Sequence, residues 1–124
     1  MSTPFPRRGD VHWVHLDPTV GSEIAKTRPC LIVSNDRGNQ YAARVTVAAI
    51  TSRGVERTYP FEVLLQPGDG GLSETSKVLL DQIRSVDKQR LGRRIGTLSA
   101  STMAAVSRAI RLSLGLDDDR TERR

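Results

Sequence analysis

The apolar residues of this chain come in short runs, and this pattern constrains the fold more than any other feature. Each run spans four to seven residues and is rich in Val, Ile and Leu, and turn-forming residues such as Gly, Pro, Asn and Asp lie between most of them. Runs of this length and composition are typical of β-strands. They predict six short strands, at residues 10–16, 30–34, 45–50, 61–65, 77–80 and 93–98.

A single stretch has the periodicity of a longer α-helix. Its apolar residues recur at spacings of three and four: Met103, Val106, Ile110 and Leu114. Ser99 can cap the first turn, and Gly115 stands where a left-handed residue often ends a helix. The pattern predicts a helix at 99–114 with its apolar side in the core, and a short helical turn is expected at 37–41. Short strands joined by turns and closed by one helix predict a small, mainly antiparallel barrel.

The length of the chain bounds its organisation. A chain of 124 residues suffices for one hydrophobic core but not for two ordinary domains, so we expect one domain at 1–116 and a charged tail at 117–124. Residues 1–8 are expected to form a loose arm. No apolar run approaches the roughly 20 residues needed to cross a bilayer, and the N-terminal residues lack a secretory signal, which makes the cytoplasm the expected compartment. Cys30 is the single cysteine, so no intramolecular disulfide can form, and no metal-ligand cluster is visible.

The charge of the chain favours a polyanionic partner. The formal net charge is +5, and most of the positive residues are arginines, since only Lys26, Lys77 and Lys88 are lysines. Arginine presents a planar fork that binds phosphate through two hydrogen bonds. This bias suits nucleic acid, although arginines also decorate ordinary solvated surfaces.

The stretch 17–36 joins a long polar loop to an apolar strand. The loop, with Gly21 as its expected hinge, has a length typical of a binding loop, a lid or a mobile segment. At the join, Pro29 restricts Arg28 to an extended conformation and so holds its guanidinium at the strand start. A cation in this position can serve catalysis, or it can lie over the strand end as an ordinary surface arginine.

Two further strands end in polar side chains. Thr51, Ser52 and Arg53 follow the strand at 45–50, and their hydroxyls can either cap backbone groups or belong to a site. The strand at 77–80 runs into Asp81 and Arg84.

The strand at 10–16 carries two histidines and the only tryptophan. His12 and His15 are three residues apart and therefore point to opposite faces of a strand, so they cannot converge on one phosphate. Trp13 suits a core or interface anchor better than a base-stacking platform.

Taken together, several separated motifs resemble the MazF/PemK family of toxin endoribonucleases. They are RGDVHWVHLDPTVGSEIAKTRP, LIVSND with GNQY, VTVAAITS, KVLLDQIRSVDKQRL and the closing SLGL, in the order of the family. The resemblance implies an SH3-like antiparallel β-barrel of the CcdB/MazF type with a short helix and a C-terminal α-helix. It also implies a homodimer that cleaves single-stranded RNA without a metal or other cofactor, and a cognate MazE-like antitoxin.

The resemblance also implies roles for particular residues. Arg28 and Thr51 take the places of the catalytic arginine and threonine of the family. Glu23, Ser52, Asp81 and Gln82 fall where relatives line the RNA groove. Three cations of this chain are also expected to bind the RNA substrate: Lys26, Arg53 and Arg84. Some relatives carry a histidine where this chain has Ser22 and an arginine where it has Leu79, so a mechanism that uses those side chains is not open to this chain.

The expected chemistry needs no protein nucleophile. The neighbouring 2′-hydroxyl attacks phosphorus and yields a 2′,3′-cyclic phosphate and a 5′-hydroxyl, while Arg28 and Thr51 stabilise the charge on the phosphoryl oxygens. An arginine is a poor acid because its pKa lies above about 12, so the general acid and base stay open, with Glu23 or Asp81 as candidate bases. Two alternatives are a CcdB-like toxin that binds a protein target and a non-catalytic SH3-like nucleic-acid-binding module.

Overall fold

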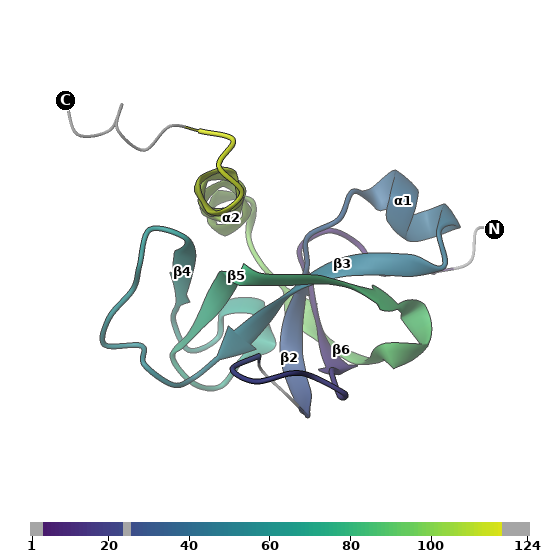
Figure 1. Cartoon of the computed structure of the whole chain (residues 1–124), viewed down its shortest axis with the longest axis horizontal. Coiled ribbons are helices and arrows are strands. Elements are labelled where there is room, and N and C mark those ends of the chain that lie inside the picture. The colour runs from purple at the N-terminus through teal and green to yellow at the C-terminus, as the bar shows by residue number, and fades with distance from the viewer. Residues whose placement is uncertain (1–3, 24–25, 118–124) are drawn as a thin grey trace.

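The computed structural model describes residues 4–23 and 26–117, which fold around one strongly bent sheet (Figure 1). Six antiparallel strands follow one another across the sheet in the order β4-β5-β3-β2-β1-β6. The elements are β1 (Asp10–His15), β2 (Thr27–Ile32), α1 (Asp36–Tyr41), β3 (Arg44–Thr51), β4 (Glu62–Leu65), η1 (Asp69–Gly71), β5 (Ser76–Asp87), η2 (Lys88–Arg90), β6 (Leu91–Thr97) and α2 (Ala100–Ser113).

The predicted architecture is confirmed as mainly β, with a short helix and a C-terminal helix. Ser99 caps α2 by accepting a hydrogen bond from the backbone N–H of Thr102, and Gly115 follows the helix in the left-handed region with φ 72°. The barrel is not closed by hydrogen bonds within the described residues, because β4 and β6 stand at the two edges of the sheet.

Two strands extend at one end by three residues or more beyond the apolar runs that predict them. β2 begins at Thr27 and includes Pro29, which pairs with Trp13 of β1. β5 continues beyond Leu80 to Asp87, because its second half pairs with β3 through Ile83 and Val86.

The long strand β5 contains a bulge at its middle. Ala48 of β3 pairs with Ile83, whereas the next residue, Ala49, pairs with Leu79. Three residues of β5, Leu80 to Gln82, therefore have no counterpart on β3. Such an insertion bends a strand and redirects its side chains, and here the redirected residues include Asp81.

The sheet has two apolar clusters, one on each face. The first lies under α2 and includes Leu31, Ile50 and Val106; the second is made by residues such as Cys30, Val47 and Ala49. Alternate residues of β2 and β3 belong to different clusters, as expected for strands covered on both faces. Figure 1 shows α2 lying over the end of the sheet formed by β4 and β5.

The N-terminal arm is held against the domain, and its prediction as a loose segment is wrong for Pro4–Arg8. Arg8 donates from Nε to the Val33 carbonyl at 3.1 Å and from a terminal nitrogen to Ser107 Oγ at 2.9 Å. Arg7 lies over the Phe5 ring at 4.4 Å. The two bonds of Arg8 tie the arm to α2 and to the end of β2. Residues 1–3 of the predicted arm lie outside the described residues.

The charged tail is described only at its first residue. Asp117 accepts two hydrogen bonds from the Arg111 guanidinium at 2.9 Å, and the remainder of the tail, 118–124, lies outside the described part of the chain. No helix in the described ranges is long and apolar enough to cross a membrane.

Candidate functional site

Two hollows lie close to the start of β2, and together they contain most of the predicted site residues. The first has a volume of about 280 Å³ and the second about 490 Å³. The first hollow lies over the second apolar cluster, since Leu16, Cys30, Val47 and Ala49 belong to both. The second hollow reaches Ile50 and Leu72 of the first cluster, so it opens on the opposite face of the sheet.

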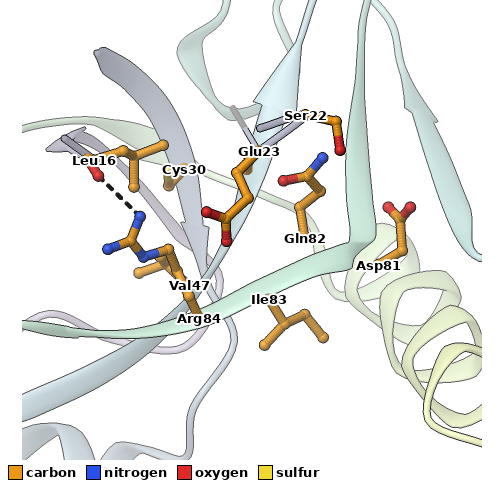
Figure 2. Close-up of a pocket in the computed structure, with 10 residues that line it drawn as sticks. Leu16, Ser22, Glu23, Cys30, Val47, Asp81, Gln82, Ile83 and Arg84 are labelled. Atoms are coloured by element: carbon orange, nitrogen blue, oxygen red, sulfur yellow. Dashed lines mark hydrogen bonds between the residues drawn. The ribbon is translucent and has the colours of Figure 1, made fainter. Parts of the chain in front are cut away.

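The first hollow brings the predicted carboxylates together. Asp81 and Gln82 reach it because the β5 bulge carries them out of the β3 ladder, and Glu23 reaches it from the loop between β1 and β2. Figure 2 shows the Glu23 side chain extending toward β5 and the Gln82 side chain rising toward Ser22 and Glu23. The Glu23 carboxylate also accepts the backbone N–H of Val20 at 2.6 Å, which orders the loop below it.

Arg84 anchors the root of this loop. It donates to the Leu16 carbonyl at 2.9 Å, the bond drawn in Figure 2, and its side chain lines the first hollow. Arg90, which the sequence does not single out, donates to the His15 and Asp17 carbonyls. Two arginines thus satisfy carbonyls at the end of β1, so Arg84 has a clear structural role besides any contact with a ligand.

Arg28 and Thr51 lie at the adjoining ends of β2 and β3. The ladder between these antiparallel strands ends at the pair Cys30 and Ala49, and Arg28 and Thr51 each lie two residues beyond that pair. Both positions are two residues from wall residues of the first hollow, so strand alternation directs their side chains to the same face as Cys30 and Ala49. Both residues are half-buried. Of the two hollows, Arg28 lines the second and not the first.

The Thr51 hydroxyl has a backbone partner. It accepts a hydrogen bond from the Arg53 N–H at 3.1 Å, which is the capping role that one reading of the sequence assigns to it. A hydroxyl that accepts one bond still has its own proton to donate. Thr51 can therefore cap the backbone and at the same time donate a hydrogen bond to a ligand.

The second hollow gathers cations around an exposed aromatic ring. Lys26, Arg28 and Ser52 line it among the predicted residues, and Trp13, Glu74 and Arg93 join them. Trp13 is 37% exposed, so the prediction of a core anchor is wrong, whereas an interface anchor stays a prediction. Gly71 forms part of the wall: a Cβ there would lie 2.3 Å from the Ile95 carbonyl oxygen, so only glycine permits this approach of η1 to β6.

Two predicted residues, Thr51 and Arg53, line neither hollow. Thr51 ends β3, and Arg53 is exposed in the loop that follows.

Three residues of the second hollow, Trp13, Glu74 and Arg93, are not predicted as site residues from the sequence, because they come from three distant segments. The one sequence signal for that face is the single tryptophan of the chain, Trp13, in the predicted strand at 10–16.

The histidines and the cysteine are not organised for catalysis. His12 Nδ1 lies 3.0 Å from the Gly92 carbonyl and His15 Nδ1 lies 3.2 Å from Thr27 Oγ1, so the two rings contact different neighbouring strands. Burial raises the pKa of the Cys30 thiol to about 12, although nearby Arg84 lowers it in part. Cys30 is thus a neutral wall residue at ordinary pH. Among the described residues, no three His, Cys, Asp or Glu side chains group closely enough to hold a metal ion.

Comparisons with known proteins point to one family. Residues 7–114 match the family model described as PemK-like, MazF-like toxin of type II toxin-antitoxin system. Endoribonuclease MazF of Staphylococcus saprophyticus is 42% identical over 94% of this chain and 98% of its own length.

Solved structures agree with this match. A mycobacterial endoribonuclease in complex with its cognate antitoxin superposes with a TM-score of 0.76 at 32% identity, covering 91% of this chain and 98% of that one. MazF of Deinococcus radiodurans superposes with a TM-score of 0.77 at 30% identity, covering 91% and 99% of the two chains.

Proposed function

The chain belongs to the PemK-like, MazF-like family of toxins of type II toxin-antitoxin systems, and on this premise we propose that it is a sequence-specific endoribonuclease of single-stranded RNA. It is an RNA-cleaving toxin that inhibits growth until a cognate MazE-like antitoxin neutralises it. The observation that carries this conclusion is the 42% identity to an endoribonuclease MazF over nearly the whole of both chains. Structures of relatives in complex with antitoxins support the regulatory half of the proposal.

In the proposed mechanism the substrate supplies the nucleophile. The 2′-hydroxyl attacks the adjacent phosphorus, the bond to the 5′-oxygen breaks, and the products carry a 2′,3′-cyclic phosphate and a 5′-hydroxyl. The protein must hold these groups in line and stabilise the additional negative charge on the phosphoryl oxygens. Arg28 can donate two hydrogen bonds to those oxygens, and the Thr51 hydroxyl can donate a third. Their positions at the adjoining ends of β2 and β3 support this joint role.

The first hollow is the proposed groove for the RNA next to the scissile bond. Glu23, Asp81 and Gln82 line it and offer acceptors and an amide to exposed base edges or 2′-hydroxyls. Lys26, Ser52, Arg53 and Arg84 are proposed to contact the RNA on either side, although Arg84 also holds the Leu16 carbonyl.

One of the two carboxylates in this hollow is proposed as the general base. Glu23→Gln and Asp81→Asn separate the alternatives, because removal of the base should abolish the acidic limb of the pH–rate profile, whereas removal of a binding group should mainly raise KM. If both variants keep the full pH profile, neither carboxylate is the base.

Three further properties complete the proposal. Residues 1–116 form a single toxin domain, the active species is a homodimer, and the protein acts in the cytoplasm, where RNA and antitoxin are available. Size-exclusion chromatography with light scattering tests the dimer, since a monomer at working concentration would contradict it.

The decisive experiment is to map cleavage ends on a long natural RNA. The purified chain should produce discrete ends at a short preferred sequence, and the ends should resist ligation that requires a 5′-phosphate. Intact RNA after prolonged incubation with folded protein would contradict the proposal. In that event, growth arrest on expression would favour a CcdB-like toxin with a protein target, and continued growth would favour a non-catalytic binding module.

A further inference from the structure

A lysine is buried in the sheet next to the proposed catalytic threonine. The Lys77 side chain is only 9% exposed, and its Nζ lies 2.9 Å from Glu62 Oε1, whose side chain is 7% exposed. Buried ion pairs add little stability compared with well-packed apolar residues, because both charges lose their hydration. A contribution to the stability of the fold therefore does little to explain why this ion pair is buried.

The position of Lys77 in the topology suggests another role. β5 lies between β3 and β4, and Lys77 is paired with Thr51 on one side and with Leu64 on the other. The connection from β3 to β4, residues 52–61, must cross β5 to join these two strands. Lys77 is thus placed where this loop, called the crossing loop below, leaves and re-enters the sheet.

The ion pair holds the crossing loop at several points. Lys77 Nζ donates to the Arg57 carbonyl at 3.0 Å, and it lies so close beneath Gly54 that a Cβ there would be 3.6 Å away. Glu62 Oε1 accepts the Tyr59 N–H at 3.0 Å in addition to the lysine. The middle and the end of the loop are therefore fastened to one buried charge pair.

The beginning of the loop is fastened to Thr51. The Arg53 N–H donates to Thr51 Oγ1 at 3.1 Å, so the course of the loop sets the orientation of that hydroxyl. Arg53 and Arg57 are both exposed along the loop, which gives it two cations on its outer side.

We propose that Lys77 is a positioning residue of the ribonuclease. Paired with Glu62, it holds the crossing loop so that the Thr51 hydroxyl is aimed at the scissile phosphate and Arg53 and Arg57 are presented to the RNA beside it. This inference rests on the proposed function, but its structural half, the fastening of the loop, can be tested without RNA.

The test compares Lys77→Met, Glu62→Gln and the double variant with the unmodified chain. Methionine keeps the apolar stem of the lysine side chain. We expect Lys77→Met to lower the unfolding midpoint, because it leaves the Glu62 charge buried and unpaired. The double variant leaves no unpaired buried charge, so its unfolding midpoint should return most of the way to that of the unmodified chain. Lys88→Met is the matched control, because it deletes the same charge at a distant turn. Lys77→Arg keeps the charge and should restore part of the activity.

Two readouts separate positioning from stability. In the folded double variant, kcat/KM should remain roughly 10- to 100-fold below that of the unmodified chain, mainly through kcat. Limited trypsin digestion followed by mass spectrometry should show faster cutting after Arg53 and Arg57 in Lys77→Met and in the double variant with Glu62→Gln. Lys88→Met should be cut there no faster than the unmodified chain.

Two results would overturn the inference. Cleavage that recovers together with stability in the double variant would reduce Lys77 to a structural residue. Unchanged trypsin sensitivity of the loop in Lys77→Met would show that the loop is held by other contacts. If the unmodified chain cuts no RNA, the proposed function fails, while the digestion still decides whether Lys77 fastens the loop.

Discussion

Replacement of Arg28 is the sharpest test of the proposed joint role of Arg28 and Thr51. In the proposed transition state, Arg28 donates two hydrogen bonds and Thr51 one to the same phosphoryl oxygens. Loss of one donor to a developing oxyanion lowers a rate by about 10² to 10³, or roughly 2.7–4 kcal/mol. We expect Arg28→Ala to lie at the upper end of this range, because it removes both of its bonds. Arg28→Lys should lose less, since it keeps the charge but not the fork.

The shared target of the two side chains makes their effects non-additive. Thr51→Val removes one donor at nearly constant volume, and Thr51→Ser keeps the hydroxyl as its control. When two groups act on the same oxygens, the double variant Arg28→Ala/Thr51→Val should lose less than the product of the single losses. Independent action would instead give the full product.

The assay is single-turnover cleavage of a fluorescent single-stranded RNA containing the mapped site, at saturating protein. Arg37→Ala, on the exposed face of α1, controls for the loss of one positive charge. Circular dichroism and the unfolding midpoint confirm that each variant is folded. A folded Arg28→Ala variant that cleaves at the unmodified rate would refute the catalytic role of Arg28 and its joint action with Thr51.

Three other predictions concern the metal, the thiol and one glycine. Cleavage should persist in excess EDTA, and loss of activity that a divalent ion restores would contradict the metal-free mechanism. Because the pKa of Cys30 is raised from 9.0 to about 12 in the folded chain, native protein binds the thiol proton more tightly than unfolded protein does. The contribution of Cys30 to the free energy of unfolding is therefore fully present below pH 9 and should fall by about 1.4 kcal/mol per pH unit as the pH rises toward 12. Urea titrations of Cys30→Ala should lack this decline. An identical slope in that variant would contradict the prediction. Gly71→Ala should destabilise the chain by roughly 1–3 kcal/mol, since φ is +79° and the new Cβ would meet the Ile95 carbonyl; an unchanged urea midpoint would show that η1 can move away.

The regular elements could be predicted because their signals are local. The alternation of β1, the unbroken apolar run of β3 and the three-and-four spacing of α2 each depend on residues within one element. The start of β2 was misplaced because Thr27-Arg28-Pro29 looks like a loop by composition. Pairing with β1 overrides that preference and extends the strand.

The candidate site was predictable in its members but not in its arrangement. The motifs single out Glu23, Arg28, Thr51 and Asp81, yet they do not show that the carboxylates occupy one hollow while Lys26 and Ser52 line another. The second hollow was missed because its residues come from distant segments: the pairing of β1 with β6 brings Trp13 close to Arg93, and Glu74 comes from the segment after η1, which lies against β6. The sequence does not distinguish Lys77 from the other two lysines, because the residues of one strand do not show whether a charged side chain is buried.

The sequence by itself determined the kinds of elements, their order, the family resemblance and the identity of the proposed catalytic pair, because these depend on neighbouring residues along the chain. Only the tertiary structure decided the three-residue bulge that brings Asp81 and Gln82 into one hollow with Glu23, the strand pairing that places the ends of β2 and β3 with Arg28 and Thr51 side by side, and the burial of Lys77 against Glu62. The physical reason is that strand register and burial arise from contacts between distant segments, and a shift of one residue in any ladder would turn each of these side chains to the other face.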